Sequence, residues 1–427
     1  MNGRRIDENP CLGPAIGTKD LPKIPVLLAQ SALPYTTNPA RIAFVTNFCP
    51  HYRVQTFEKL AQKYDVRFYF FSQGSEWYWL KELGMRKGDF PCEYLGGSNR
   101  GKAKVAFDLI HKMWRFPCDL FVKCINGRVA LPVTYIIARL RGKPFVLWTG
   151  VWQSLHTPFH RLIFPITRFV YRHSDAVVVY GDHVKRYLVT QGVDERRIFV
   201  APHAVVNEQY SRHVLPAEIT ALRLVLKLAE DERIILYVGR LESLKGIDFL
   251  LKAFAEMRMP KITLLLVGQG KEREKLTSLA SDLGVEEKVR FVGYIPPEDT
   301  VTLYAMSYAL VLPSISTPRF REPWGLVVNE AMNQGLPVIA TDAVGAAAGG
   351  LLRDGYNGLV VPERDPTRLT GALRNLLESP QLRERMGKAA LESIRPWDND
   401  KMVDGFSQAI EFALHFVKNE SAQADRR

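Results

Sequence analysis

The stretch RIILYVGRLESLKG, residues 233–246, decides the fold of the second half of the chain. Its apolar first part predicts a β-strand, Gly239 turns the chain, and a helix begins near Ile247. Arg240 and Lys245 lie in the turn, and two cations at a strand end beside a helix N-terminus suit a diphosphate. The alternative is an ordinary strand–helix turn with two solvated bases, and this segment alone does not decide between them.

The same alternation of strand and helix runs through both halves of the chain. Continuously apolar strands in such an alternation are typical of a parallel sheet that helices cover on both faces. The predicted strands are residues 41–47, 65–71, 120–125, 144–148, 176–180 and 198–200 in the first half, and 233–238, 262–267, 289–292, 310–312, 337–340 and 358–361 in the second.

The pattern lapses around residues 206–230, so the sequence predicts two successive doubly wound, Rossmann-like α/β domains. Ligands in such sheets bind outside the carboxyl ends of the strands, which predicts a site in a central cleft that the two domains face. A final helix over about 397–418 is expected to cross back onto the first domain. The predicted parts are a flexible leader (1–40), a first domain (41–205), a second domain (206–395), and the crossover helix with a tail (396–427).

Composition narrows the class of protein. The 427 residues are 47% hydrophobic and 24% charged, which excludes a disordered, collagen-like or disulfide-scaffold protein. The formal charge of +12 favours a partner that carries phosphate: a nucleotide, a nucleic acid or an anionic membrane. Five cysteines without a Cys-x-x-Cys pair, and no apolar run long enough to span a bilayer, predict a cytoplasmic protein.

Two further motifs follow in the second half. Gly268 and Gly270 come directly after a strand, but the third glycine of the dinucleotide fingerprint is missing, which argues against a nicotinamide cofactor. In REPWGLVVNEAM, residues 321–332, Glu322 is expected on a loop and Glu330 on the helix that follows. Backbone N–H groups at the start of that helix are suited to phosphate. The alternative is a loop glutamate and a salt-bridged helix glutamate.

The order of these motifs resembles that of the retaining GT-B glycosyltransferases of the glycogen-synthase-like "glycosyl transferases group 1" superfamily. The match covers about residues 230–395, and it implies that the second domain (206–395) binds the nucleotide sugar and the first domain (41–205) binds the acceptor. The motifs that carry it are Gly239-Arg240…Lys245-Gly246, Gly268-x-Gly270, Phe291-Val-Gly293, Leu312-Pro-Ser314, Glu322-x7-Glu330 and Gly335-Leu-Pro-Val338.

The resemblance implies a hexosyltransferase that uses a nucleotide-diphosphate sugar, retains the anomeric configuration and needs neither a bound metal nor another cofactor. It implies that Arg240 and Lys245 neutralise the leaving diphosphate, and that Glu322 contacts hydroxyls of the donor sugar. It also implies a set of donor-binding residues, in which Tyr294 lines the base, Glu330 binds the ribose and backbone groups approach the phosphates. That set is Gly239, Gly268, Gly270, Tyr294, Trp324, Gly325, Leu326 and Glu330.

The first half departs from the family pattern. The loop after its first strand, TNFCPHYR over residues 46–53, has no glycine, although some relatives have a similar Pro-x-Tyr-Arg segment. Arg53 is therefore a candidate for donor phosphate or an anionic acceptor, with a surface arginine as the alternative. Many members have a histidine at the end of the strand that matches 144–148, whereas this chain continues Thr-Gly-Val-Trp152. Trp152 and His156 are the candidates on the acceptor side.

The window from residue 120 to residue 174 has eight Lys or Arg and no Asp or Glu. Within it, residues 159–172 mix bulky apolar groups with spaced arginines, which is typical of a helix at a membrane interface. A crossover helix whose arginines face water is the alternative. The aromatic run at residues 76–80 is a further candidate on the acceptor side, because sugars stack on such rings, with internal packing as the alternative.

These observations favour transfer of a hexose to a glycolipid or polysaccharide acceptor in cell-surface or exopolysaccharide biosynthesis, by a cytoplasmic or peripheral membrane enzyme. The enzymatic alternative is a GT-B sugar-nucleotide epimerase. An alternative of another class is a basic nucleic-acid-binding protein, although no nucleic-acid-binding module is recognisable and no nucleic-acid partner is expected. A third alternative is a non-catalytic relative of these enzymes.

Overall fold

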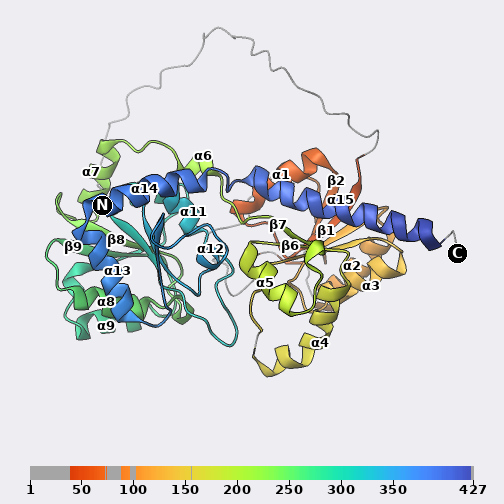
Figure 1. The fold of residues 1–427 in the computed structure, drawn as a ribbon, viewed down its shortest axis with the longest axis horizontal. Helices are drawn as coiled ribbons and strands as arrows, with labels where there is room; N and C mark the ends of the chain where they lie inside the picture. The colour runs from red at the N-terminus through yellow and green to blue at the C-terminus, as the bar shows by residue number, and fades with distance from the viewer. Residues whose placement is uncertain (1–38, 73, 75–87, 97–101, 155, 425–427) are drawn as a thin grey trace, which may run out of the picture. The chain divides into compact units, whose positions relative to one another are not determined.

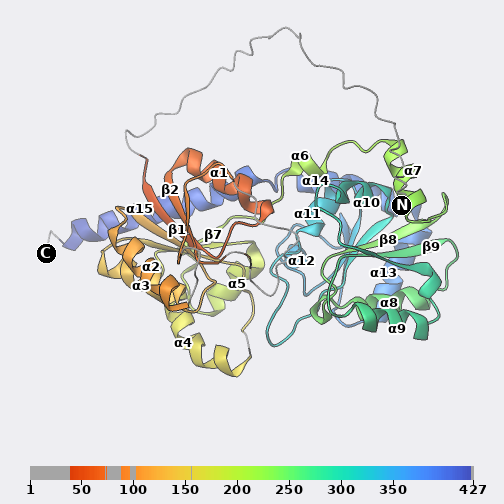
Figure 2. The same ribbon diagram turned by 180° about the vertical axis from the view of Figure 1, so that it is seen from behind.

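The computed structural model describes residues 39–72, 74, 88–96, 102–154 and 156–424. The predicted leader, apart from its last two residues, and the aromatic run at 76–80 lie outside this part of the chain. Residues 40–427 form one unit of contacts, in which two parallel sheets are each covered by helices (Figures 1 and 2).

The first sheet has seven parallel strands in the order β3-β2-β1-β4-β5-β6-β7. Its order reverses between β1 and β4, as in other doubly wound sheets. The strands are β1 (Arg41–Thr46), β2 (Asp65–Phe70), β3 (Cys92–Tyr94), β4 (Leu120–Cys124), β5 (Phe145–Thr149), β6 (Ala176–Val179) and β7 (Ile198–Val200). The helices are α1 (Val54–Lys63), α2 (Lys102–Arg115), α3 (Ala130–Leu140), α4 (Pro158–His173) and α5 (Asp182–Thr190).

The second sheet has six parallel strands in the order β10-β9-β8-β11-β12-β13, and its order reverses between β8 and β11. The strands are β8 (Arg233–Val238), β9 (Ile262–Val267), β10 (Val289–Gly293), β11 (Ala309–Leu312), β12 (Val338–Thr341) and β13 (Gly358–Val361). The helices from the linker onward are α6 (Asn207–Tyr210), α7 (Pro216–Val225), α8 (Ile247–Met257), α9 (Arg273–Asp282), α10 (Thr300–Met306), α11 (Val327–Met332), α12 (Gly345–Ala348), α13 (Pro366–Glu378) and α14 (Pro380–Ile394).

The predicted crossover helix is α15 (Asn399–Ala424), which packs on α1, β5, β6 and β7 of the first sheet. Asn399 anchors its start, because its amide accepts from Thr56 and donates to Gln55 and to the carbonyl of Val205. Further along, the Phe406 ring lies 5.1 Å from the ring of Trp148. The two-sheet GT-B architecture and the return of the last helix to the first sheet are thus confirmed.

The structure differs from the sequence prediction in two details. Strand β3 was not predicted, because it has only three residues and pairs with β2 alone at the edge of the sheet. Helix α15 extends to Ala424 rather than to about residue 418. No helix in the described part of the chain is both long and apolar enough to cross a bilayer.

Candidate functional site

The carboxyl ends of β8 and β11 meet where the order of the second sheet reverses, which is where ligands bind in doubly wound sheets. The chain after β8 leads through Arg240 into a single 3₁₀ turn, Ser243–Lys245. The chain after β11 leads through Ser314 to the loop that carries Glu322. The backbone N–H of Ile315 donates to the carbonyl of Leu244 at 2.9 Å, which ties the two loops together.

Lys245 and Glu322, both predicted for this site, form an ion pair in which Lys245 Nζ donates to Glu322 Oε2. Ser314 Oγ donates to the same oxygen at 3.1 Å. The side chains of Lys245 and Glu322 are only 12% and 10% exposed. The pair therefore places one cation and one carboxylate, largely removed from solvent, at the reversal point of the sheet, where removal of either partner leaves a costly unpaired charge.

The glycines after β8, β9 and β10 hold the strand ends together. Gly268 donates to the carbonyl of Gly293 at 2.6 Å, and Gly239 donates to the carbonyl of Val267 at 2.9 Å. A Cβ on Gly268 would lie 1.9 Å from the carbonyl oxygen of Gly239, and one on Gly270 would lie 2.1 Å from that of Leu241. These glycines are thus needed, first of all, because the turns after the neighbouring strands pack closely against one another.

Arg240 lies within this set of turns and is half-buried, and the hydroxyl of Tyr237 donates to its carbonyl at 2.7 Å. Tyr294, the candidate for the base, directly follows Gly293 and is also half-buried.

The segment between Glu322 and Glu330 enters α11, as the sequence predicts. Trp324 is buried: its indole N–H donates to Asn329 Oδ1 at 2.8 Å, and its ring stacks on that of Trp397 at 5.4 Å. Its side chain thus packs inside the protein, so a contact of Trp324 with a donor would involve its backbone. Gly325 and Leu326 follow it, half-buried, at the start of α11.

Glu330 lies on α11 and is held by two tyrosines. The hydroxyl of Tyr304 donates to its carboxylate at 2.5 Å, and Tyr210 is a second hydrogen-bond partner. Burial raises the pKa of Glu330 to about 7, although both tyrosine hydrogen bonds favour the ionised form. Neither tyrosine is close to Glu330 in the sequence, so this environment could not be predicted.

The raised pKa predicts the effect of Glu330→Gln on stability. Between pH 4.5 and about 7 the unfolded chain releases the Glu330 proton before the folded protein does, so this residue lowers stability as the pH rises. Such a pKa difference corresponds to about 3 kcal/mol. We expect Glu330→Gln to unfold like the wild type at pH 4.5 and to be more stable by up to that amount at pH 8, measured by urea unfolding.

Glu286→Gln, which changes an exposed carboxylate, is the matched control and is expected to show no such pH-dependent gain. An equal gain in stability in both variants, or no gain for Glu330→Gln at pH 8, would contradict a raised pKa of the Glu330 carboxylate.

Residues of the first half, 152–154 and 156, lie along the loop that carries Glu322. The indole N–H of Trp152 donates to the carbonyl of Glu322 at 3.0 Å. Gln153 Nε2 donates to the carbonyl of Thr317 at 2.8 Å, and the backbone N–H of His156 donates to that of Pro318, also at 2.8 Å. Trp152 and His156, predicted on the acceptor side, thus lie beside the Glu322 loop; the His156 side chain is exposed.

His183, in the first turn of α5, is a residue of this region that the sequence analysis missed. Its Nε2 lies 3.0 Å from the carbonyl oxygen of Pro323, and its ring lies 4.8 Å from that of Trp152. Burial lowers the pKa of His183 to about 4, so its imidazole is neutral at pH 7 and Nε2 carries the proton that it donates to Pro323. The signal that could have identified it in the sequence was a histidine three residues after the end of the predicted strand 176–180.

These contacts predict that Trp152 positions Glu322. In Trp152→Phe the ring can keep its contacts with His183 and with Arg321, whose guanidinium carbon lies 3.6 Å from the ring centroid, but the N–H donated to Glu322 is lost. Loss of one hydrogen bond of about 1.4 kcal/mol predicts a tenfold lower kcat for sugar transfer. Nucleotide affinity, measured by calorimetry, is expected to stay within twofold. An unchanged kcat would exclude a positioning role.

Arg53 lies at the carboxyl end of the first sheet and is not a surface arginine, because it is only 7% exposed. It donates to the hydroxyl of Tyr180 at 2.6 Å, and its guanidinium carbon lies 4.1 Å from the ring centroid of Trp148. Tyr180 also explains a departure from the family pattern. A Cβ on Gly150, at the end of β5, would lie 2.3 Å from the Tyr180 ring, so no histidine fits there.

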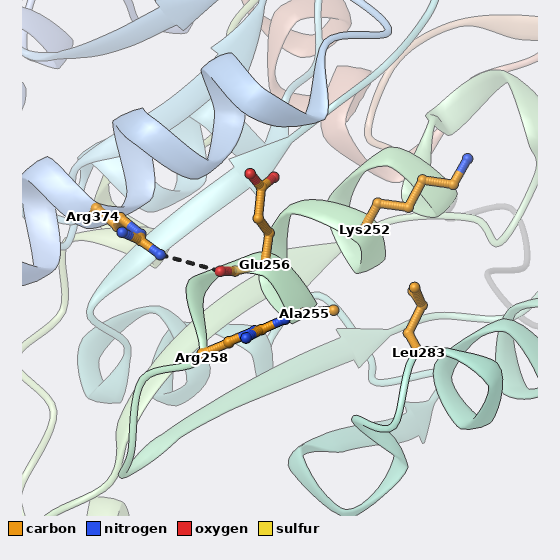
Figure 3. Close-up of a pocket in the computed structure, with 6 residues that line it drawn as sticks. All are labelled: Lys252, Ala255, Glu256, Arg258, Leu283 and Arg374. Atoms are coloured by element: carbon orange, nitrogen blue, oxygen red, sulfur yellow. Dashed lines mark hydrogen bonds between the residues drawn. The ribbon is translucent and has the colours of Figure 1, made fainter.

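A separate depression, shown in Figure 3, lies between α8, the end of α9 and α13. It is lined by Lys252, Glu256, Arg258 and Arg374, and Arg374 donates to the carbonyl of Glu256 at 3.1 Å. Lys245 precedes the first residue of α8, whereas Arg258 follows its last, so this depression is not the candidate site. Among the residues that the structure describes, no three His, Cys, Asp or Glu side chains gather so that they could hold a metal ion.

Comparison with known families covers both halves of the chain. The model "Glycosyltransferase Family 4" matches residues 92–209, and "Glycosyl transferases group 1" matches residues 218–393. Together the two matches span more than half of the chain and contain the motifs from Arg240 to Glu330.

Curated relatives match mainly over part of their length. The D-inositol 3-phosphate glycosyltransferase of Acidothermus cellulolyticus is 34% identical over 237 residues, which are 52% of this chain and 50% of that protein. The alpha-D-kanosaminyltransferase of Streptomyces kanamyceticus is 28% identical over 278 residues, which are 62% of this chain and 70% of that protein. The chain thus spans about half the length of the inositol-phosphate enzymes that it matches.

Among solved structures, Anabaena Alr3699/HepE in complex with UDP superimposes with a TM-score of 0.70 at 20% identity, covering 87% of this chain and 99% of that one. At this identity the likeness supports the fold. With the two family matches and the two-sheet architecture, it leads to one conclusion: the chain belongs to the GT-B glycosyltransferases whose two halves match "Glycosyltransferase Family 4" and "Glycosyl transferases group 1".

Proposed function

We propose that this protein transfers a hexose from a UDP-sugar to a glycolipid or polysaccharide acceptor, with retention of anomeric configuration. The observation that carries the proposal is the Lys245–Glu322 pair, with Ser314, at the reversal point of the second sheet. UDP is the nucleotide that we expect because the Alr3699/HepE complex holds it on the same fold.

In the proposed reaction the bond between the anomeric carbon and the β-phosphate oxygen breaks. The acceptor oxygen bonds to the anomeric carbon on the same face of the sugar, and the hydroxyl proton passes to the departing β-phosphate oxygen. Arg240 and Lys245 stabilise the charge that develops on the diphosphate, which a preorganised cationic site does most effectively away from water. Glu322 holds donor hydroxyls and Glu330 holds the ribose.

The ion pair suggests how the donor enters. The Glu322 carboxylate is the ion-pair partner of the Lys245 ammonium. A diphosphate that displaces it takes Lys245 as its own partner and leaves the Glu322 carboxylate to accept hydrogen bonds from the sugar. The diphosphate and the sugar of the donor are then both bound when Lys245 and Glu322 exchange each other for the donor as hydrogen-bonding partner.

We place the acceptor on the side of the first domain, beside Trp152, His156 and Arg53, and the reaction at the cytoplasmic face of a membrane. The described cysteines, Cys49, Cys92, Cys118 and Cys124, are free thiols, which agrees with a reducing compartment. The names of the relatives above, a D-inositol 3-phosphate glycosyltransferase and an alpha-D-kanosaminyltransferase, do not point to one common acceptor, so the acceptor has to be identified by experiment.

Thermal unfolding with UDP, GDP, ADP and dTDP, without added metal, is the first test. A nucleotide at about 100 times its dissociation constant stabilises the fold by about 2.7 kcal/mol. We expect UDP to give the largest shift. UDP release with acceptor extracts, followed by NMR of the product, then tests transfer and the α-linkage. No shift with any nucleotide at millimolar concentration, together with no UDP release, would overturn the proposal.

A further inference from the structure

The first domain has an unusual concentration of exposed apolar side chains. In the described part of the chain fifteen large hydrophobic residues are exposed, and nine of them lie on α2, α3 and α4 or directly before α3. Single exposed apolar residues are normal, whereas a group of them indicates an interaction surface. The nine are Phe107, Ile110, Trp114, Val129, Ile136, Leu140, Leu162, Ile166 and Phe169.

These three helices form one layer. Helix α2 packs on α3, and the ring of Tyr135 on α3 lies 6.0 Å from that of Phe169 on α4. Both ribbon views show the three helices on the side of the first sheet that is opposite α1 and α15 (Figures 1 and 2). On α4 the exposed residues Leu162, Ile166 and Phe169 follow the spacing of one helical face. The exposed side chains of the layer point away from the sheet that their helices cover.

The exposed charged side chains described on this layer are basic, and the acid of α2, Asp108, is half-buried and accepts from the backbone N–H of Gly96 at 2.8 Å. Arg115, Arg128, Arg161 and Arg172 are exposed on or beside the three helices. Residues 120–174 contain no acid. Both acids that flank this window form ion pairs: Asp119 pairs with Arg41, and the buried Asp175 pairs with Arg139.

Two of the eight basic residues in the window do not belong to this surface. Lys123 is buried and donates to the carbonyls of Cys124 and Asn126, and Arg139 is the partner of Asp175. Lys123 is thus internal and Arg139 is neutralised by Asp175, whereas Arg128, Arg161 and Arg172 lie exposed among the apolar groups of the surface.

We propose that this surface of α2, α3 and α4 docks on an anionic lipid bilayer. Apolar side chains that enter the interface, flanked by arginines that meet lipid phosphates, are the pattern of a peripheral membrane contact. A nucleic acid would pair with the arginines but would leave nine large apolar side chains exposed. The charge favours an anionic partner, and the bilayer accounts for both observations.

The surface is also close to the candidate site along the chain. Helix α4 begins at Pro158, six residues after Trp152, whose indole donates to Glu322. Six residues span at most about 20 Å. A bilayer that holds α4 would therefore keep the Glu322 loop near its surface, where a lipid-linked acceptor is presented. This consequence rests on the proposed function, whereas the docking itself does not.

The test is flotation of the full-length protein, without donor, on vesicles of phosphatidylcholine with 30% phosphatidylglycerol and on vesicles of phosphatidylcholine alone. We expect binding to the anionic vesicles that is at least tenfold stronger and that falls in 0.5 M NaCl. Leu162→Glu and Arg161→Glu should each lower it at least fivefold. Leu224→Glu on α7 and Arg385→Glu on α14 are matched controls, since Leu162 and Leu224 are 76% and 80% exposed and both arginines are exposed.

Equal binding by all four variants, or no binding to anionic vesicles, would overturn the proposal. So would a dimer in solution that Leu162→Glu dissociates, because the surface would then be covered by a second copy. The UDP-induced thermal shift of Leu162→Glu should equal that of the wild type. If UDP produces no thermal shift in any variant while vesicle binding stays intact, the result counts against the proposed function and not against the docking surface.

Discussion

Glu322→Gln is expected to lower the turnover of sugar transfer at least a hundredfold and to leave UDP affinity equal to or higher than that of the wild type. The amide keeps the size of the side chain and can still accept from Ser314, but it no longer carries the charge that pairs with Lys245. A carboxylate whose contact strengthens in the transition state is worth about 2.7 kcal/mol or more. Lys245, released from its ion pair, becomes more available to the diphosphate.

The measurements are initial rates of UDP release with acceptor and calorimetric titration with UDP. Glu286→Gln is again the matched control, because it changes an exposed carboxylate on the same domain. Turnover within threefold of the wild type would remove Glu322 from the reaction. A turnover and a UDP affinity that fall together, with a lowered thermal midpoint, would show that the variant damages the site as a whole.

Lys245→Met is expected to weaken UDP binding at least thirtyfold, for two reasons that act together. The variant removes the cation that would meet the diphosphate, and it leaves the Glu322 carboxylate facing the diphosphate without a partner. The second reason leads to an unusual expectation: Lys245→Met/Glu322→Gln should bind UDP more tightly than Lys245→Met alone.

Calorimetry with UDP and urea unfolding of the four proteins form a double-mutant cycle. Each single variant is expected to lose about 1 to 3 kcal/mol of stability, below the cost of a fully buried pair because both side chains keep some exposure. The double variant should lose less than the sum. Losses of affinity that simply add would show that the two residues do not share one ligand.

Much of the architecture was predictable because the strands of doubly wound sheets are uniformly apolar. Twelve of the thirteen strands were predicted from such runs. The exception, β3, is short and half exposed, so its sequence carries no continuous apolar signal. The crossover of α15 was expected because its helical pattern lies beyond the last predicted strand, although the pattern itself does not say which sheet the helix covers.

The candidate site was predictable residue by residue but not as a set of contacts. Lys245 and Glu322 could be named from motifs 77 residues apart, whereas their ion pair depends on how two loops meet. Trp152 was named for the acceptor side, but the hydrogen bond of its indole to a backbone carbonyl of the second domain could not be foreseen. The buried state of Arg53 depends on Trp148 and Tyr180, which no local pattern around Arg53 reveals. Such contacts are tertiary and leave no periodicity in the sequence.

The return of α15 to the first sheet has a consequence for how the protein is made. Phe406 contacts both Phe44 and Trp148, so the interior of the first domain includes a residue that the ribosome adds more than two hundred positions after β7. The second domain can fold during synthesis as soon as it emerges, but the first must wait with part of its apolar interior uncovered. A fragment that stops at residue 395 should therefore aggregate, and a chimera that exchanges first domains must carry its own α15.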